Sequence, residues 1–197
     1  MRIGILGAGA LGTAFARHLL ASGHDVVLSD SRGPESLAGL VSELGPGATA
    51  DTRYEAAQAE IVVLAVPRPD VAAALEGLPD WNGRILVDAT DDFSASPAPG
   101  RITTSEEVCV LAPGARVIKA LNHLFAASLA GEPHLAAGSR VLFVSGDDED
   151  AKKTLSAVLT SLGYLPVVLG DLAEGGRLHQ AVGEPLVGRD LIRLEAD

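Results

Sequence analysis

A glycine-rich run near the start of the chain has a spacing that suits phosphate binding. It follows a short apolar run at residues 2–6 and precedes a stretch with helical periodicity. The residues of this GxGxxG pattern are Gly7, Ala8, Gly9, Ala10, Leu11 and Gly12. Between a strand and a helix, such glycines allow a tight turn, close approach of a pyrophosphate, and close packing of the helix on the strand. A turn that only connects two elements has the same pattern, but the flanking elements favour dinucleotide binding.

A second polar group follows the next apolar run. Asp30 lies near the spacing of about 20 residues at which an acidic side chain binds the ribose hydroxyls of NAD. Ser31 and Arg32 come next. A hydroxyl and a guanidinium suit the extra phosphate of NADP, which a carboxylate would repel. Residues 30–34 are also typical of a plain turn, so the pattern indicates NADP(H) or NAD(H) and leaves the choice open.

Three further strand ends carry residues that we expect near the reactive ring, because ligands of parallel sheets bind beyond the carboxyl ends of the strands. The candidates for cofactor contact are Ala65, Val66, Pro67, Ala89 and Thr90. The candidate catalytic residues are Asp88, Asn122 and His123. Each of these three is equally typical of a residue that only caps an element or holds a loop.

The elements that must position these residues alternate along the chain. Strands are predicted at residues 2–6, 25–29, 60–66, 84–88, 116–120, 141–144 and 165–169, with a short one near Ala48. Helices are predicted at residues 10–20, 34–44, 69–76, 104–113 and 148–162. Several strands are continuous apolar runs, which is typical of a parallel sheet covered on both faces. The sequence therefore predicts an α/β fold of the Rossmann type, with a doubly wound, mainly parallel sheet.

Two local features refine this outline. Residues 104–107 (TSEE) have the spacing of a capping box and should begin a helix. The polar loop at residues 91–101 is the best candidate for a mobile segment.

Length and composition bound the class of protein. A chain of 197 residues is expected to form one domain over residues 1–197. No apolar run approaches the roughly 20 residues of a membrane span, and the first residues do not have the pattern of an export leader, so we expect a cytoplasmic protein. The net charge of −11 opposes nucleic-acid binding, and the spread of the 5 histidines predicts no metal site.

Several segments together resemble the family of deazaflavin (coenzyme F420) dependent NADP oxidoreductases. They are residues 2–12, 29–37 (SDSRGPESL), 62–67 (VVLAVP), 117–124 (VIKALNHL), 146–148 and 170–178 (GDLAEGGRL). The first and third occur across many β-hydroxyacid-type dehydrogenases, whereas the second, fourth and sixth are more particular. The resemblance implies hydride transfer between nicotinamide C4 and C5 of a flat deazaflavin, with the two rings stacked at the strand ends. The protein then mainly supplies proximity and orientation.

The chain departs from the family pattern in two places. Family members commonly have Asn at the position of Asp30, which bears on the preference for NADP. They usually continue Asn-Pro after Thr90, whereas this chain reads Asp91-Asp92-Phe93, beside the expected acceptor site. Related reductases of hydroxy acids add a helical domain for the substrate, and this length has no room for one. We therefore expect the acceptor to bind against the Rossmann domain, completed by the 91–101 loop, the carboxyl-terminal segment or a second subunit.

The sequence thus predicts an NADP-dependent oxidoreductase that transfers hydride between NADP(H) and coenzyme F420. An alternative keeps NAD(P)H and reduces another small acceptor, an imine, a flavin or a metal chelate, with His123 or Asp88 in proton transfer. Another alternative is a sensor that binds NADP(H) without turnover. The apolar residues within 186–194 need cover from the domain's own sheet or from a second copy, which would make a homodimer.

Overall fold

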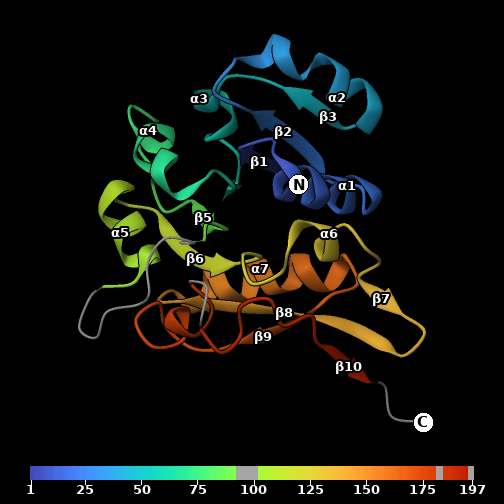
Figure 1. Cartoon of the computed structure of the whole chain (residues 1–197). Helices are drawn as coiled ribbons and strands as arrows, with labels where there is room; N and C mark the ends of the chain where they lie inside the picture. The colour runs from blue at the N-terminus through green and yellow to red at the C-terminus, as the bar shows by residue number, and fades with distance from the viewer. Residues whose placement is uncertain (92–101, 181–183, 195–197) are drawn as a thin grey trace.

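The structure is a computed structural model and describes residues 1–91, 102–180 and 184–194 (Figure 1). Its centre is a 10-stranded sheet in the order β10-β8-β6-β5-β4-β1-β2-β3, with β7 and β9 both paired to β8. Helices cover both faces of this sheet. The predicted α/β fold with a doubly wound, mainly parallel sheet is confirmed.

Parallel strands make up one side of the sheet. They are β1 (Arg2–Leu6), β2 (Asp25–Ser29), β3 (Ala48–Ala50), β4 (Ile61–Leu64), β5 (Ile85–Asp88) and β6 (Arg116–Ala120). Their spatial order is β3-β2-β1-β4-β5-β6, so the winding reverses between β1 and β4. Leu6 at the end of β1 pairs with Ser29 on one side and Leu64 on the other. Ligands of such sheets bind beyond the strand ends at this switch point.

Side chains of these strands pack into two cores, one on each face. Ile3 and Ile5 of β1 lie in one core with Phe15, whereas Leu6 lies in the other with Trp81. The first core is covered by α1 (Ala10–Ala21), α2 (Ala38–Leu44), α6 (Ala126–Leu129) and α7 (Glu149–Ser161). The second is covered by α3 (Arg53–Ala56), α4 (Val71–Leu75) and α5 (Thr104–Leu111). Burial on both faces explains why the strands are continuous apolar runs.

The other side of the sheet is mixed. Its strands are β7 (His134–Leu135), β8 (Gly138–Gly146), β9 (Leu165–Val168) and β10 (Ile192–Leu194). β8 runs antiparallel to β6, and β9 runs parallel to β8. A parallel crossover usually needs a long helix. The chain between β6 and β8 holds the short α6 and β7 and no long helix, and it returns antiparallel, which the sequence pattern did not predict.

Several predicted elements are interrupted or shifted at their starts. The predicted helix 34–44 begins as a 3-10 turn, η1 (Pro34–Leu37), before α2, and the predicted helix 69–76 begins as η2 (Arg68–Asp70) before α4. A third such turn, η3 (Gly176–His179), lies in the carboxyl-terminal segment. Four-residue helices such as α3 and α6 show too little periodicity to be predicted.

The predicted capping box exists, but it starts one residue earlier than expected. The Thr103 hydroxyl accepts a hydrogen bond from the Glu106 backbone N–H at 3.1 Å, and the Glu106 carboxylate accepts one from the Thr103 N–H at 2.5 Å. Thr103, and not Thr104, is therefore the cap. Its backbone is extended, which lets its side chain accept the hydrogen bond from the first turn, whereas Thr104 is already the first residue of the helix. The predicted mobile loop lies almost wholly outside the described residues.

Across the described ranges, every helix is too short or too polar to cross a lipid bilayer.

Gly4 in β1 supplies a test of how tightly α3 packs on the sheet. A Cβ at Gly4 would overlap the backbone carbonyl oxygen of Ala56, whereas a Cβ at the exposed Gly39 of α2 meets nothing within 4 Å. We expect Gly4→Ala to lower the free energy of unfolding by about 1–3 kcal/mol or more. Gly39→Ala should raise it by about 0.5–1 kcal/mol, because alanine favours the helix. Urea unfolding of both variants measures this, and equal stabilities would contradict the packing.

Candidate functional site

Two cavities lie along the carboxyl ends of the parallel strands. The larger has a volume of about 730 Å³ and the smaller about 520 Å³. Both have Gly9, Ala65, Val66 and Pro67 in their walls, so they meet above the switch point between β1 and β4. Together they form one elongated site, and an extended dinucleotide is a ligand of that shape.

The glycine pattern forms the floor between the two cavities. Gly7 has a φ of 109° and donates its N–H to Ser29 O at 2.9 Å, which makes the tight turn after β1. A Cβ at Gly12 would overlap the carbonyl oxygen of Gly7, so Gly12 allows α1 to pack closely on the turn. A Cβ at Gly9 meets nothing within 4 Å, because it would point into open space. No side chain caps the start of α1, and its first N–H groups are therefore available to a phosphate.

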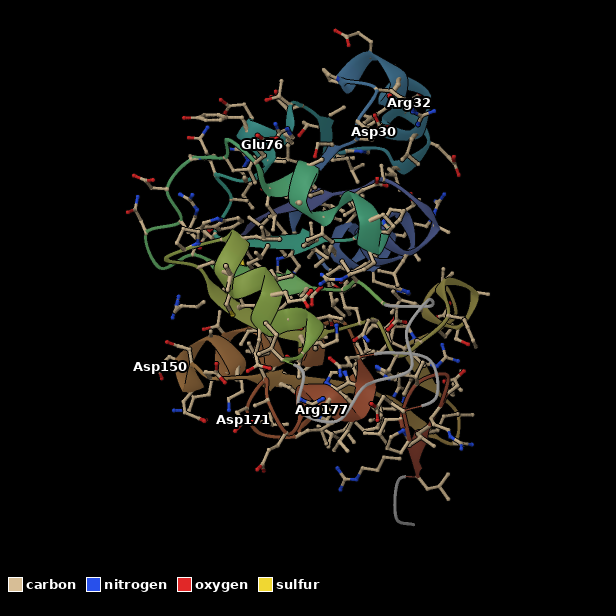
Figure 2. All side chains as sticks on the ribbon, turned by 60° about the vertical axis from the view of Figure 1, so that its left-hand side comes forward. Asp30, Arg32, Glu76, Asp150, Asp171 and Arg177 are labelled. Carbon is tan, nitrogen blue, oxygen red and sulfur yellow. The ribbon has the colours of Figure 1, made fainter. Side chains whose placement is uncertain are left out.

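Asp30 and Arg32 meet at the far end of the smaller cavity, where Figure 2 shows their side chains together. The Arg32 Nη2 atom lies 2.6 Å from Asp30 Oδ2, and Asp30 Oδ1 accepts hydrogen bonds from the Arg32 N–H and the Ser36 hydroxyl. Burial favours the neutral acid, but these contacts outweigh it and lower the pKa of Asp30. The Asp30 side chain is 12% exposed and that of Arg32 is 73% exposed, so the guanidinium is the partner on the open surface.

Most of the residues predicted to contact the cofactor line this combined site. Gly7, Ala8, Asp30, Ser31 and Arg32 line the smaller cavity; Ala10, Leu11, Ala89, Thr90, Asn122 and His123 line the larger. Gly12 and Asp88 line neither. They lie behind the wall, where Gly12 fixes the packing of α1 and Asp88 is completely buried.

Asp88 belongs to a buried network under the end of β5. Its carboxylate lies 3.2 Å from Lys119 Nζ and accepts hydrogen bonds from Ser105 Oγ at 2.5 Å and Thr90 Oγ1 at 2.6 Å. Lys119 also donates to the Thr90 carbonyl at 2.9 Å. Burial alone would raise the pKa of Asp88, but the Lys119 charge and the hydrogen bonds from Ser105 and Thr90 hold it below its ordinary value. The carboxylate does not reach the cavity, so Asp88 positions the Thr90 turn.

Lys119 is the residue of this network that sequence reasoning missed. It stands inside the apolar run of β6, and in the sheet it is the register partner of Asp88 on β5. The sequence did contain a signal for this pair, because Asp88 and Lys119 are opposite charges within two predicted apolar strands. A charge in such a run is buried only when it is paired.

Asn122 and His123 line the larger cavity after β6. Asn122 donates from Nδ2 to Asp91 Oδ1 at 3.0 Å and to the backbone oxygen of His179, whereas its Oδ1 has no partner among the described residues. Burial lowers the pKa of His123 to about 4, although the Val141 backbone favours the charged ring. His123 is therefore neutral at neutral pH, where it serves in packing or hydrogen bonding and not as an acid.

The carboxyl-terminal segment completes one wall of the larger cavity. Val187 lines it, and the Gly188 N–H donates to the His123 carbonyl at 2.7 Å. Gln180 accepts a hydrogen bond from the Thr104 N–H at 2.9 Å, which fixes the segment against α5. Of the predicted 91–101 loop, only Asp91 is described, and it lies in the cavity wall.

Within the described ranges, no cluster of three or more His, Cys, Asp or Glu side chains could hold a metal ion.

A Rossmann sheet with an open glycine turn and an elongated site over its switch point is the architecture of a nicotinamide-dependent oxidoreductase. The family model for NADP oxidoreductases dependent on coenzyme F420 matches residues 2–92. A protein from Arthrobacter sp. FB24, named as an F420-dependent NADP reductase, is 31% identical, with a TM-score of 0.73 over 87% of this chain and 86% of its own. The chain belongs to this family and is an NAD(P)-dependent oxidoreductase.

Three further proteins resemble this chain to different extents. A hypothetical protein from Sinorhizobium meliloti is 41% identical, with a TM-score of 0.89, and the match covers 98% of this chain and 95% of that one. Metalloreductase STEAP3 of Rattus norvegicus is 31% identical over 173 residues, which are 87% of this chain and 34% of the relative. The chain thus spans about a third of that curated relative. A reductive aminase from Aspergillus terreus, 21% identical with a TM-score of 0.62 over 89% of this chain and 56% of its own, shares the fold.

Gly9 offers a test of cofactor approach that spares the fold. Since its Cβ position is open, we expect Gly9→Ala to cost less than about 1 kcal/mol of stability, mainly through the weaker cap. The added methyl group should occupy the space of the pyrophosphate and weaken NADPH binding about tenfold or more. Fluorescence titration and thermal unfolding measure the two effects, with Gly39→Ala as the control. Unchanged NADPH affinity would mean that the dinucleotide does not cross Gly9.

The buried Asp88–Lys119 pair predicts an unusual dependence of stability on pH. Lys119→Met leaves the Asp88 charge buried and unpaired, which should cost about 3–5 kcal/mol at pH 7. In the native protein the lowered pKa of Asp88 contributes stability above its ordinary value near 4, and this is lost as pH falls through the folded pKa. In the variant the unpaired carboxyl has a raised pKa, so its stability should instead fall as pH rises from 4 to 7.

Urea unfolding of both proteins at pH 5 and pH 7 tests this, because Asp88 should give the native protein almost no pH dependence in that range, whereas the stability of the variant should fall. The double variant Asp88→Asn with Lys119→Met is the control, because it removes both charges and should recover much of the stability. A single variant as stable as the native protein at both pH values would show that the pair is not buried.

Proposed function

We propose that this chain transfers hydride between NADP(H) and the deazaflavin coenzyme F420. The observation that carries the proposal is the cavity of about 730 Å³ that adjoins the glycine turn and lies over the ends of β4, β5 and β6. A nicotinamide ring would occupy the part beside Ala65 and Val66, and space for a second flat ring remains. Membership of the family and the name of the Arthrobacter relative support F420 as that second ring.

The residues of the cavity suit a reaction whose chemistry lies in the bound cofactors. NADPH, when bound, supplies a hydride from its nicotinamide ring. The wall is largely apolar, with Leu11, Pro67 and Phe125 among its residues. Such a wall excludes water and holds two rings against each other. Neither the neutral His123 nor the enclosed Asp88 is placed to give up a proton, and hydride transfer between two rings needs no triad.

The smaller cavity supports NADP(H) as the cofactor in preference to NAD(H). Asp30 is already neutralised by Arg32, and it keeps the hydrogen bonds from Ser36 and the Arg32 N–H if the guanidinium turns away. The exposed Arg32 can then bind a 2′-phosphate together with Ser31, while Arg53 stands in the same wall. A bidentate guanidinium is the usual partner of such a phosphate.

A second candidate function is the reduction of a flavin or a metal chelate with the same NADPH site. It is favoured by the likeness to a metalloreductase over 87% of this chain. The same apolar cavity would accept a flavin ring as readily as a deazaflavin. The predicted homodimer stays a prediction, for which Leu191 and Leu194 at 44% and 69% exposure are the candidate contact residues.

Steady-state kinetics on the purified chain tests the proposal. We expect NADPH to be oxidised in equal amount to F420 reduced, with NADPH preferred over NADH. Arg32→Ala should lower kcat/KM for NADPH by about tenfold or more and leave the value for NADH nearly unchanged, because only NADPH carries the 2′-phosphate. Turnover with a flavin or ferric chelate but not with F420 would establish the second candidate instead. Saturable NADPH binding without any turnover would indicate a sensor.

A further inference from the structure

Arg68 is the one lysine or arginine among the described residues that line the larger cavity. It lies four residues after the end of β4, between Pro67 and Pro69, and is the first residue of the 3-10 turn η2. The two prolines restrict the backbone on both sides of Arg68, so its side chain starts from a rigid segment of backbone at the cavity wall. We propose that Arg68 recognises an anionic group, a phosphate or a carboxylate, on the acceptor. This inference rests on the proposed hydride transfer to an acceptor in this cavity, but not on which acceptor it is.

The hydrogen-bonding state of Arg68 is incomplete without a ligand. Its Nη2 atom pairs with Glu107 Oε2 of α5, whereas its Nη1 atom is buried and has no partner in the described parts of the chain. A buried donor without a partner costs about 1–3 kcal/mol, and such groups are rare in native proteins. The Arg68 side chain is 19% exposed, in contrast to 73% for Arg32 at the other end of the site. Arg68 is therefore a largely enclosed residue of the cavity wall, whereas Arg32 lies on the open surface.

An anion is the ligand that this arrangement suits. A guanidinium offers parallel N–H groups that bind both oxygens of a carboxylate or phosphate. The side chain of the present partner, Glu107, is 37% exposed, so its pair with Arg68 is broken at little cost when another anion replaces it. The acidic residue of the same wall, Asp91, already accepts a hydrogen bond from Asn122. Glu107 thus holds the guanidinium in position and competes weakly with the acceptor.

The position of Arg68 assigns it to the acceptor and not to the phosphates of NADP(H). Arg32 and Arg53 line the smaller cavity, together with Gly7 and Gly9, and Arg68 does not. Arg68 instead shares the larger cavity with Thr90, Asn122 and Phe125. Changes at Arg68 should therefore alter the affinity for acceptors and leave that for NADPH unchanged.

Pairs of acceptors that have the same ring, with and without an anionic side chain, test this assignment. The probes are FMN with riboflavin, and F420 with the same deazaflavin alcohol lacking its phosphate ester. With the native protein and saturating NADPH, we expect KM for at least one phosphorylated member to be about tenfold lower than for its partner. Arg68→Gln should abolish that preference while kcat and the NADPH dissociation constant stay within about twofold.

Two further variants separate recognition from structural damage. Glu107→Gln removes the competing carboxylate and should lower KM for the phosphorylated acceptor, the opposite of the Arg68→Gln effect. Arg17→Gln breaks another Arg–Glu pair, between Arg17 of α1 and Glu43 of α2, and should change neither KM, because neither residue lines a cavity.

The outcomes distinguish this inference from the proposed function. A preference for FMN over riboflavin that depends on Arg68, without any use of F420, supports the inference and removes F420 as the acceptor. Equal KM values within both pairs, or a preference that survives Arg68→Gln, overturn the inference and leave hydride transfer standing. The inference also fails if none of the four compounds is bound or reduced by the NADPH-loaded protein, or if Arg68→Gln weakens NADPH binding alone.

Discussion

The ion pair between Asp88 and Lys119 is the constraint on which the site depends. Both side chains are completely buried, and their strands, β5 and β6, lie side by side in register. A buried charge is tolerated only with a partner and with its remaining hydrogen bonds satisfied. Thr90 and Ser105 supply those hydrogen bonds, and in doing so they tie the turn after β5 to the start of α5. The wall of the larger cavity at Thr90 is thus held by two charged side chains that do not line the cavity themselves.

The glycine turn is shaped by the same demand for close packing. α1 and α3 approach the sheet so closely that Gly4 and Gly12 have no space for a side chain, whereas Gly9 faces open space. Gly4 and Gly12 are therefore required by the packing of the fold, whereas Gly9 leaves space for a ligand. Because the strands pack on both faces, the open end of the sheet is the place where backbone donors remain available to a ligand.

The electrostatic design of the site divides it into two ends. Arg32 and Asp30 stand at one end, Arg68 and Glu107 at the other, and a largely apolar region lies between them. Each arginine is paired with a carboxylate, so a protein with a net charge of −11 presents guanidinium groups to anionic ligands at two separate points. In the proposed reaction, the proximity of two rings between these ends accounts for the chemistry, since the described wall offers His123 only in its neutral form.

The sequence by itself determined the local features: the α/β alternation, the glycine turn, the residues at the strand ends, and the family. These depend on near neighbours in the chain, through hydrophobic periodicity and turn geometry. Only the tertiary structure decided which strand-end residues reach the cavity, because that depends on register between strands far apart in sequence. It buried Asp88 with Lys119, turned β8 antiparallel, and brought Val187 and Arg68 to the larger cavity. In the sequence, Lys119 and Arg68 are far from the carboxylates they pair with, and only packing brings Lys119 to Asp88 and Arg68 to Glu107.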